Sequence, residues 1–221
     1  MPDRWATFDC YGTLIDWNRG IGDALQSLWP EADRAALLRG YHEAEPEVQA
    51  AGARPYREIL GLCTERVAAG LDLPPVSGAD KALADSLPGW PPFPEVPEAL
   101  QELRDAGWRL AILSNTDPDL LAASVTALEV PVDLTVTVAE AGSYKPAPGH
   151  WSAFRRTSGA APDRHVHVAA SLFHDIAPCA ELGIPAVWIN RLGETSDLPR
   201  AGELPDCGQL QATLARLVRR L

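Results

Sequence analysis

Short apolar segments alternate with helical stretches along most of this chain, and this alternation limits its fold more than any other feature. The first segment runs from Arg4 to Cys10, and the second, Arg109 to Ser114, follows a stretch over 96–106 whose leucines recur at helical spacing. Three further segments of this kind, each after a helical stretch, lie at 133–138, 165–169 and 186–189. Strands that alternate with helices form βαβ units, so the sequence predicts an α/β fold with a parallel sheet.

The interval 17–90 breaks this alternation, because it contains helical patterns and no strand pattern. We expect helices over 21–28, 32–43, 56–69 and 79–87, separated by breakers such as Pro46. We interpret the interval as an all-helical insertion, so the expected domains are a core of residues 1–16 and 91–221 and a helical cap of residues 17–90. Two closely spaced chain crossings are what a lid over an active site requires.

The end of the chain is expected to add no strand. Residues 201–207 have the composition of a loop, and a final helix is expected over 209–221.

Charge and composition exclude several classes of partner. The 221 residues include 30 acidic and 19 basic side chains, which gives a net charge of −11. Such a chain has no basic stripe to attract nucleic acid or an anionic membrane surface, so neither partner is expected. No segment has the apolar length of a signal peptide or a membrane span, which predicts a cytoplasmic protein. The four cysteines form no CxxC pair, and we expect reduced thiols.

Polar residues stand where the expected strands end. In a parallel sheet these ends share one edge, and ligands bind in the crevice outside it. The first strand ends at Asp9 and the second at Ser114-Asn115, while Lys145 and Asp175 follow the third and fourth. They offer a carboxylate nucleophile, a cation beside it and a second carboxylate that could act on water. The sequence therefore predicts a site of nucleophilic catalysis at this edge.

Four motifs carry a resemblance to a known family. They are Phe8-Asp-Cys-Tyr-Gly-Thr-Leu14, Leu113-Ser-Asn115, Tyr144-Lys-Pro146 and His174-Asp175, at spacings of 105, 31 and 30 residues from Asp9 through Ser114 and Lys145 to Asp175. Over essentially its whole length the chain resembles the haloacid dehalogenase superfamily, and within it the type II (L-2-haloacid) dehalogenase branch. The resemblance implies a Rossmann-like core with the helical insertion as its cap.

For this branch, the resemblance implies a two-step hydrolysis at the α-carbon of a small 2-substituted carboxylic acid. Asp9 would displace the leaving group and form an ester, Lys145 would keep Asp9 ionised, and Asp175 would orient or deprotonate the water that hydrolyses the ester. The expected catalytic residues are Asp9, Lys145, Asp175, Thr13 and Ser114. The residues expected to bind substrate are Cys10, Tyr11, Asn115, Arg39, Trp151 and Ser171. The expected partner is the small carboxylate, and a homodimer is allowed.

Two departures distinguish this chain from the phosphatases of the superfamily. Those enzymes carry an acid two residues after the nucleophile, where it protonates the leaving alkoxide, and this chain has Tyr11 there. They also bind magnesium partly through acidic residues at the positions of Ala170 and Ser171, neither of which is a carboxylate. A halide leaves without a proton, so both departures favour a dehalogenase that needs no metal and no other cofactor.

Alternative functions stay open at this point. The fourth motif is similar to that of a subgroup that includes azetidine-2-carboxylate hydrolase, which opens a ring at the same α-carbon. A magnesium-dependent phosphatase would follow the dominant chemistry of the superfamily. A non-catalytic binding protein would fit the apolar residues Ala170 and Leu172, which stand where the family has polar groups.

Overall fold

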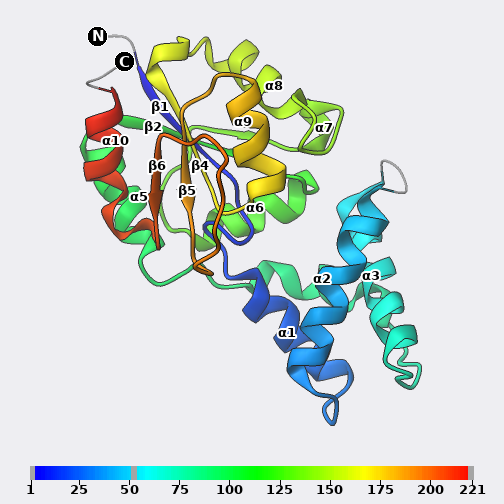
Figure 1. The fold of residues 1–221 in the computed structure, drawn as a ribbon. Helices are drawn as coiled ribbons and strands as arrows, with labels where there is room; N and C mark the ends of the chain where they lie inside the picture. The colour runs from blue at the N-terminus through cyan, green and yellow to red at the C-terminus, as the bar shows by residue number, and fades with distance from the viewer. Residues whose placement is uncertain (1–2, 51–53, 219–221) are drawn as a thin grey trace. The chain divides into compact units, whose positions relative to one another are not determined.

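The computed structural model describes residues 3–50 and 54–218 (Figure 1). Within these residues six parallel strands form one sheet, in the order β3-β2-β1-β4-β5-β6. The strands are β1 (Arg4–Phe8), β2 (Trp108–Leu113), β3 (Leu134–Val136), β4 (His165–Ala169), β5 (Ala186–Ile189) and β6 (Gly202–Leu204). The parallel α/β fold predicted from the sequence is confirmed, and the first five strands lie within two residues of their expected bounds.

Strand β1 occupies the middle of the sheet, between β2 and β4. Thr7 of β1 is aligned with Ala111 of β2 on one side and with His167 of β4 on the other. All the strands run in the same direction, so their carboxyl ends lie at one edge of the sheet. The backbone N–H of Asp9 still donates to the carbonyl of Val168 at 3.1 Å, which holds the residue after β1 against this edge.

Helices cover both faces of the sheet (Figure 1). One face is covered by α5 (Val96–Asp105) and α10 (Leu210–Val218), which also contact each other. The other face is covered by α7 (Val138–Ala141), α8 (Gly149–Ser158) and α9 (Ala177–Glu181). Shorter helical turns are η2 (Pro162–Arg164), η3 (Leu172–Ile176) and η4 (Cys207–Gln209). The sheet is therefore buried on both sides, as its nearly continuous apolar strands require.

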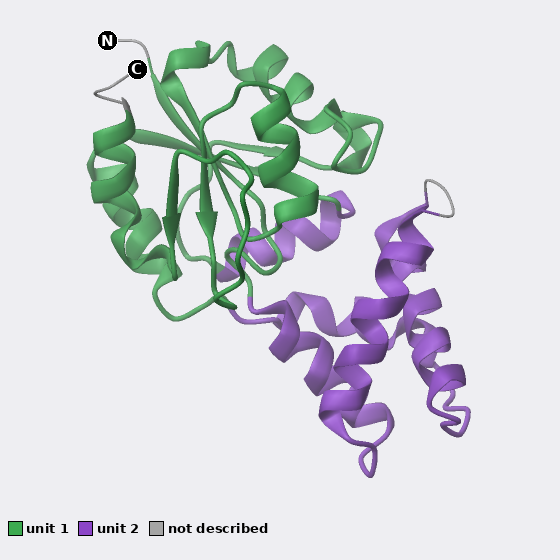
Figure 2. Ribbon diagram, viewed as in Figure 1, with its two compact units in different colours: residues 1–15, 92–115, 128–221 green, residues 16–91, 116–127 purple. Residues whose placement is uncertain are grey.

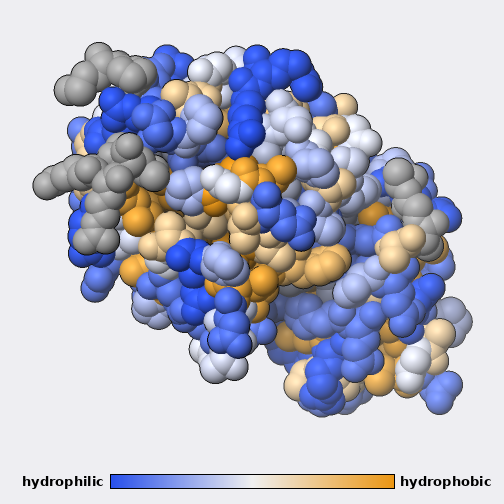
Figure 3. All heavy atoms as spheres, turned by 45° about the horizontal axis from the view of Figure 1, so that its top comes forward, coloured by the Kyte–Doolittle hydropathy of each residue, from blue (hydrophilic) through white to orange (hydrophobic). Residues whose placement is uncertain are grey.

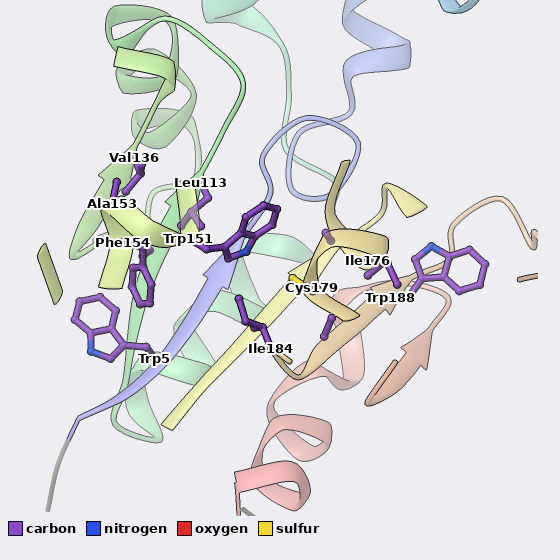
Figure 4. Packing of buried hydrophobic residues seen from close by; sticks show 13 residues of the cluster. Trp5, Leu113, Val136, Trp151, Ala153, Phe154, Ile176, Cys179, Ile184 and Trp188 are labelled. Atoms are coloured by element: carbon purple, nitrogen blue, oxygen red, sulfur yellow. The ribbon is translucent and has the colours of Figure 1, made fainter. Parts of the chain in front are cut away.

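Large side chains fill the space beneath α8 and α9 (Figure 4). The rings of Trp5 and Phe154 meet edge to face with centroids 5.4 Å apart. Trp151 of α8 is 1% exposed and belongs to the same buried cluster as Ile176 and Cys179. Edge-to-face aromatic pairs add about 0.5–1.5 kcal/mol to the effect of burial, so this cluster fixes α8 on the sheet.

The chain divides into two compact units (Figure 2). Unit 1, the sheet unit, consists of residues 1–15, 92–115 and 128–221, and unit 2, the helical unit, consists of residues 16–91 and 116–127. Residues 16, 91 and 116–127 were expected in the core domain and group with the helices instead.

The helical unit contains α1 (Trp17–Leu28), α2 (Arg34–Ala50), α3 (Tyr56–Gly70), α4 (Ala79–Ser86), η1 (Leu87–Gly89) and α6 (Pro118–Ala127). The segment before α6 caps α3: the Asp117 carboxylate accepts hydrogen bonds from the backbone N–H groups of Tyr56 and Arg57, both at 3.0 Å. Arg57 also binds the carboxylate of Asp119. A carboxylate at a helix N-terminus satisfies N–H groups that have no partner in the helix, so Asp117 ties the segment before α6 to α3, while α6 itself contacts η1.

Two expectations for secondary structure are wrong. Pro46 was expected to end a helix, yet it lies inside α2, which continues to Ala50. The helix continues because Tyr41 and Val48, on either side of the proline, are both buried. The loop expected at 201–207 contains the short edge strand β6, in which Leu204 aligns with Ile189 of β5. The last residues of the expected final helix, 219–221, lie outside the described residues.

Figure 3 shows a face on which hydrophilic residues predominate, with smaller groups of hydrophobic residues between them. Phe173 and Leu192 are large apolar side chains that stay exposed, to 65% and 77%. None of the helices in the described part of the chain combines the length and the hydropathy needed to cross a membrane.

Candidate active site

A tight loop follows β1 and carries the first part of the site. The N–H groups of Leu14 and Ile15 both donate to the carbonyl of Cys10, at 2.8 and 3.0 Å. Gly12 has a φ of 87°, which lies in the left-handed region that favours glycine. This turn brings Thr13 back towards Asp9, so that the Thr13 hydroxyl donates to Asp9 Oδ2 at 2.9 Å. The Asp-x-x-Gly-Thr spacing therefore has a direct structural reason.

Lys145 joins the two carboxylates of the site. Its Nζ lies 2.8 Å from Asp9 Oδ1 and 2.7 Å from Asp175 Oδ1, and it donates a third hydrogen bond to the carbonyl of Leu113 at 2.9 Å. The three donors of the ammonium group are thus all used. Strand ends that lie far apart in the sequence bring these groups together, as the sequence predicts from the shared edge of the sheet.

The charges of this cluster stabilise one another. Burial opposes the charged form of Lys145, but Asp175 and Asp9 raise the pKa of the lysine above its ordinary value. Burial alone would raise the pKa of Asp175. The Lys145 ammonium and a hydrogen bond from His167 outweigh burial, so the pKa of Asp175 lies below its ordinary range. A buried ion pair of this kind persists only when both ions are well hydrogen-bonded. Lys145 and Asp175 are therefore both charged at neutral pH.

Solvent reaches these charged side chains unequally. The Asp9 side chain is 12% exposed, whereas Lys145 is 1% and Asp175 is 0% exposed. Among these three residues, Asp9 is thus the group that a small molecule can approach directly. A carboxylate that is paired with a neighbouring cation and accessible to substrate is suited to act as a nucleophile.

Asn115 holds the backbone of Lys145. Its Nδ2 donates to the Lys145 carbonyl at 3.1 Å, and the Lys145 N–H donates to Asn115 Oδ1 at 2.7 Å. The side chain was expected to bind substrate, and the structure shows it engaged with the lysine backbone. A capping box formed by Thr137 and Glu140 begins the short helix α7 that leads towards this lysine.

Ser114 and Thr13 differ in how their hydroxyl groups are bonded. Ser114 is 1% exposed, its Oγ has no hydrogen-bond partner among the described residues, and its carbonyl lies 3.0 Å from His150 Nε2. Thr13 Oγ1 also accepts the N–H of Ala170 at 2.9 Å, which ties the loop after β1 to the end of β4. Their roles as hydrogen-bond donors to substrate stay predictions.

The remaining expected substrate-binding residues have different surroundings. Cys10 is fully buried, and burial, followed by the nearby Asp9, raises the pKa of its thiol well above the ordinary value. Ser171 accepts the N–H of His174 at 3.0 Å and so begins η3. Trp151 lies in the core, with its ring centroid 5.6 Å from that of His167. Tyr11 is partly buried and forms an isolated bridge with Ile15.

Arg39, the remaining expected substrate-binding residue, belongs to the helical unit. It lies on α2 with its side chain 65% exposed, and its Nη2 is 3.8 Å from Asp33 Oδ2. Exposed ion pairs of this kind contribute little to stability. A role for Arg39 in binding an anion stays a prediction.

Sequence analysis missed several residues that support the site. His167 Nε2 lies 2.9 Å from Asp175 Oδ1, and Thr7 Oγ1 lies within hydrogen-bond distance of both His167 and His165. The two histidines alternate along a buried strand, which places them on one face of β4. Histidine twice on one face of a buried strand is a signal that could have identified them.

Arg191 also supports the site, from the loop after β5. Its Nη2 donates to the Thr13 carbonyl at 2.8 Å and lies 2.7 Å from Glu95 Oε1. Its guanidinium stacks on Phe93 at 3.6 Å from the ring centroid. No sequence pattern links Arg191 to Thr13, because 178 residues separate them.

The residues at this edge do not fit a magnesium site. Lys145 Nζ binds Oδ1 of both Asp9 and Asp175, and the neighbouring position Ala170 has no side-chain oxygen. Among the described residues, no three His, Cys, Asp or Glu side chains are grouped so that they could hold a metal ion. Magnesium prefers several oxygen ligands, and this arrangement does not supply them.

Comparisons with known proteins identify relatives of this chain. The family model for haloacid dehalogenase-like hydrolases matches residues 4–183. Haloacetate dehalogenase H-2 of Moraxella sp. (strain B) is 27% identical over 210 residues, covering 90% of each chain, and (S)-2-haloacid dehalogenase 1 of Pseudomonas sp. (strain CBS-3) is 26% identical over 226 residues, covering 99% of each. The solved structure of the L-2-haloacid dehalogenase RSc1362 has a TM-score of 0.86 and 25% identity, covering 97% of this chain and 100% of that one.

Proposed function

Because the chain belongs to the haloacid dehalogenase-like hydrolase family, we propose that it hydrolyses small 2-haloacids through an ester formed on Asp9. The observation that carries this proposal is the buried Lys145 ammonium between two carboxylates, of which Asp9 alone is partly exposed. The relatives named as haloacetate and (S)-2-haloacid dehalogenases support a short 2-haloacid as the substrate class.

The first step forms the ester. An oxygen of the Asp9 carboxylate attacks the α-carbon from the side opposite the halogen, the carbon–halogen bond breaks, and the halide leaves with the bonding electrons. Lys145 favours the ionised nucleophile before the attack, because an adjacent positive charge stabilises a carboxylate. The leaving group departs without a proton, in keeping with Tyr11 at the position where an acid would stand.

The second step hydrolyses the ester. Asp175 Oδ2 is buried and has no hydrogen-bond partner among the described residues, so it can accept a proton from a water molecule. The hydroxide attacks the carbonyl carbon of the Asp9 ester, and the bond from that carbon to the bridging oxygen, which came from Asp9, breaks. The departing 2-hydroxyacid takes the proton from Asp175, and the new Asp9 carboxylic acid releases its own proton to solvent, which restores the nucleophile. Lys145 and Thr13, which donate to the two Asp9 oxygens, would stabilise the negative oxygen of the tetrahedral intermediate.

Oxygen-18 labelling tests this route. The protein is incubated with each enantiomer of 2-chloropropionate in oxygen-18 water, and the peptide that contains Asp9 is examined by mass spectrometry. We expect label in Asp9 after several turnovers, halide release without added metal, and loss of both with Asp9→Asn. Label that enters the product in a single turnover and never enters Asp9 would exclude the ester.

A second arm of the same experiment identifies the leaving group. Azetidine-2-carboxylate replaces the haloacid, since its ring nitrogen can leave from the α-carbon as an amine without help from an acid at position 11. Ring opening with label in Asp9, in the absence of activity on any haloacid, would assign the alternative substrate class and leave the ester chemistry in place.

A further inference from the structure

A buried chain of hydrogen-bonding groups leads from the interior of the sheet to Asp175. His165 Nε2 lies 2.7 Å from Thr7 Oγ1, which lies 2.8 Å from His167 Nδ1, and His167 Nε2 lies 2.9 Å from Asp175 Oδ1. All four side chains are at most 2% exposed. The proposed steps above use only the last member of this chain.

Chemistry fixes the direction of the last hydrogen bond. An ionised carboxylate only accepts, so His167 must carry a proton on Nε2. If the ring is neutral, its bare Nδ1 accepts from the Thr7 hydroxyl, and the Thr7 oxygen accepts from His165 Nε2. If the ring is charged, the Thr7 hydroxyl turns and donates to His165. In both patterns His167 donates to Asp175 and Thr7 holds the opposite side of the ring.

The two oxygens of Asp175 have unequal surroundings as a result. Oδ1 accepts from Lys145 Nζ at 2.7 Å and from His167 Nε2 at 2.9 Å, whereas Oδ2 has no partner among the described residues. The Trp151 and His167 rings also pack edge to face, with centroids 5.6 Å apart. The carboxylate is thus held on one side with a single oxygen available as an acceptor.

We infer that His167 is a positioning residue for ester hydrolysis, because it fixes the Asp175 carboxylate so that Oδ2 meets the attacking water. The inference rests on the proposed function, in which Asp175 acts on that water. Lys145 binds both Asp9 and Asp175 and so serves both steps, whereas His167 binds Asp175 and Thr7. Loss of the His167 donor should therefore slow the second step and spare the first.

Two substitutions at this position test the inference by rapid-quench measurement of each step with 2-chloropropionate. His167→Leu removes the donor, and we expect ester hydrolysis to slow by about 10- to 100-fold, the effect of a misplaced catalytic group. Ester formation should stay within about 2-fold of the wild-type rate, so the Asp9 adduct accumulates and is seen by intact-protein mass spectrometry. His167→Gln keeps an N–H near the position of Nε2 and should restore most of the hydrolysis rate.

His165→Leu is the matched control, because it removes a buried histidine from the same face of the same strand without removing the donor to Asp175. We expect His165→Leu to leave the ratio of the ester-formation rate to the ester-hydrolysis rate close to that of the wild type. The inference is overturned if His167→Leu leaves that ratio unchanged, or if His165→Leu shifts it equally. A wild-type protein that forms neither adduct nor product would instead contradict the proposed function.

A measurement on the unaltered protein covers the case in which His167→Leu does not fold. Nitrogen-15 labelling of the histidines, read by long-range proton–nitrogen NMR, identifies the protonated ring nitrogens. We expect the His167 signal to show a proton on Nε2 at neutral pH. A His167 ring with a bare Nε2 cannot donate to Asp175 and would overturn the inference.

Discussion

Asn115 and Lys145 bind each other through two hydrogen bonds, one from the Asn115 amide to the lysine carbonyl and one from the lysine N–H to the Asn115 oxygen. The pair closes a ring between the end of β2 and the loop after α7. Because the lysine ammonium is buried among carboxylates, a small shift of its backbone would change both of its ion pairs. Asn115 therefore sets the place of Lys145 in the site.

Asn115→Asp tests this relationship. The carboxylate can still accept the Lys145 N–H, but it places a second acceptor against the Lys145 carbonyl in place of a donor. We expect kcat for 2-chloropropionate to fall by about 10- to 100-fold through misplacement of the lysine, with KM nearly unchanged. Steady-state halide release measures both constants. A rise in KM at constant kcat would show that Asn115 binds substrate directly.

Lys145→Met removes the cation and leaves two carboxylates close together in a buried site. We expect loss of turnover and a loss of about 3–5 kcal/mol in the free energy of unfolding at neutral pH, the usual cost of breaking a buried ion pair. Without the lysine, burial raises the pKa of Asp175 in the folded variant above its value in the unfolded chain. The folded variant then binds a proton more readily than the unfolded chain, so its free energy of unfolding falls as pH rises. The stability difference from the wild type should thus narrow between pH 8 and pH 5 in urea unfolding. A constant difference would contradict the ionic account.

Two buried histidines should make the free energy of unfolding of the wild-type protein fall in acid. Burial lowers the pKa of His150 to about 4 and that of His165 to about 3, from 6.5. The unfolded chain binds protons below pH 6.5 while the folded state does not, so stability falls as pH decreases from 7 to 5. Each histidine should contribute roughly 1–2 kcal/mol to this loss. Urea unfolding at both pH values measures it, and His150→Gln should show a smaller loss than the wild type.

Replacing Gly61 or Gly70 in α3 with alanine should change the stability of the protein in opposite directions. A Cβ at Gly61 would lie 2.5 Å from the backbone oxygen of Asp80, whereas a Cβ at Gly70 would meet no atom within 4 Å. Gly61→Ala should cost about 1–3 kcal/mol, because the backbone of α4 cannot move aside as a side chain can. Gly70→Ala should stabilise the protein by about 0.4–1 kcal/mol, because alanine lowers the conformational entropy of the unfolded chain. Thermal unfolding of the two variants should show shifts of opposite sign.

Local patterns predict most of the fold, and tertiary contacts account for the rest. Strands buried on both faces give apolar runs that are visible in the sequence, and the four motifs identify the family, which the family model confirms. Strand β6 is not predicted, because an outermost strand of only three residues is too short to show an alternating hydrophobic pattern. The helix end expected at Pro46 is wrong because burial of the surrounding helix outweighs the tendency of proline to break a helix.

The site shows the same limit. Asp9, Thr13, Lys145 and Asp175 stand in short motifs, and their convergence follows from the shared edge of a parallel sheet. His167 and Arg191 act through partners that are distant in sequence, so only the register of β1 with β4 and the path of the loop after β5 bring them into place. Asn115 is visible in a motif, but its hydrogen bonds to the Lys145 backbone depend on how two loops meet.

The burial of Lys145 also determines how this protein reacts with amine-directed reagents. The sequence contains two lysines, and Lys81 on α4 is exposed while Lys145 is held as a buried ammonium between carboxylates. A protonated, inaccessible amine does not react with an activated ester or an aldehyde. Such reagents should therefore attach a dye or a surface to the folded protein through Lys81 rather than through Lys145.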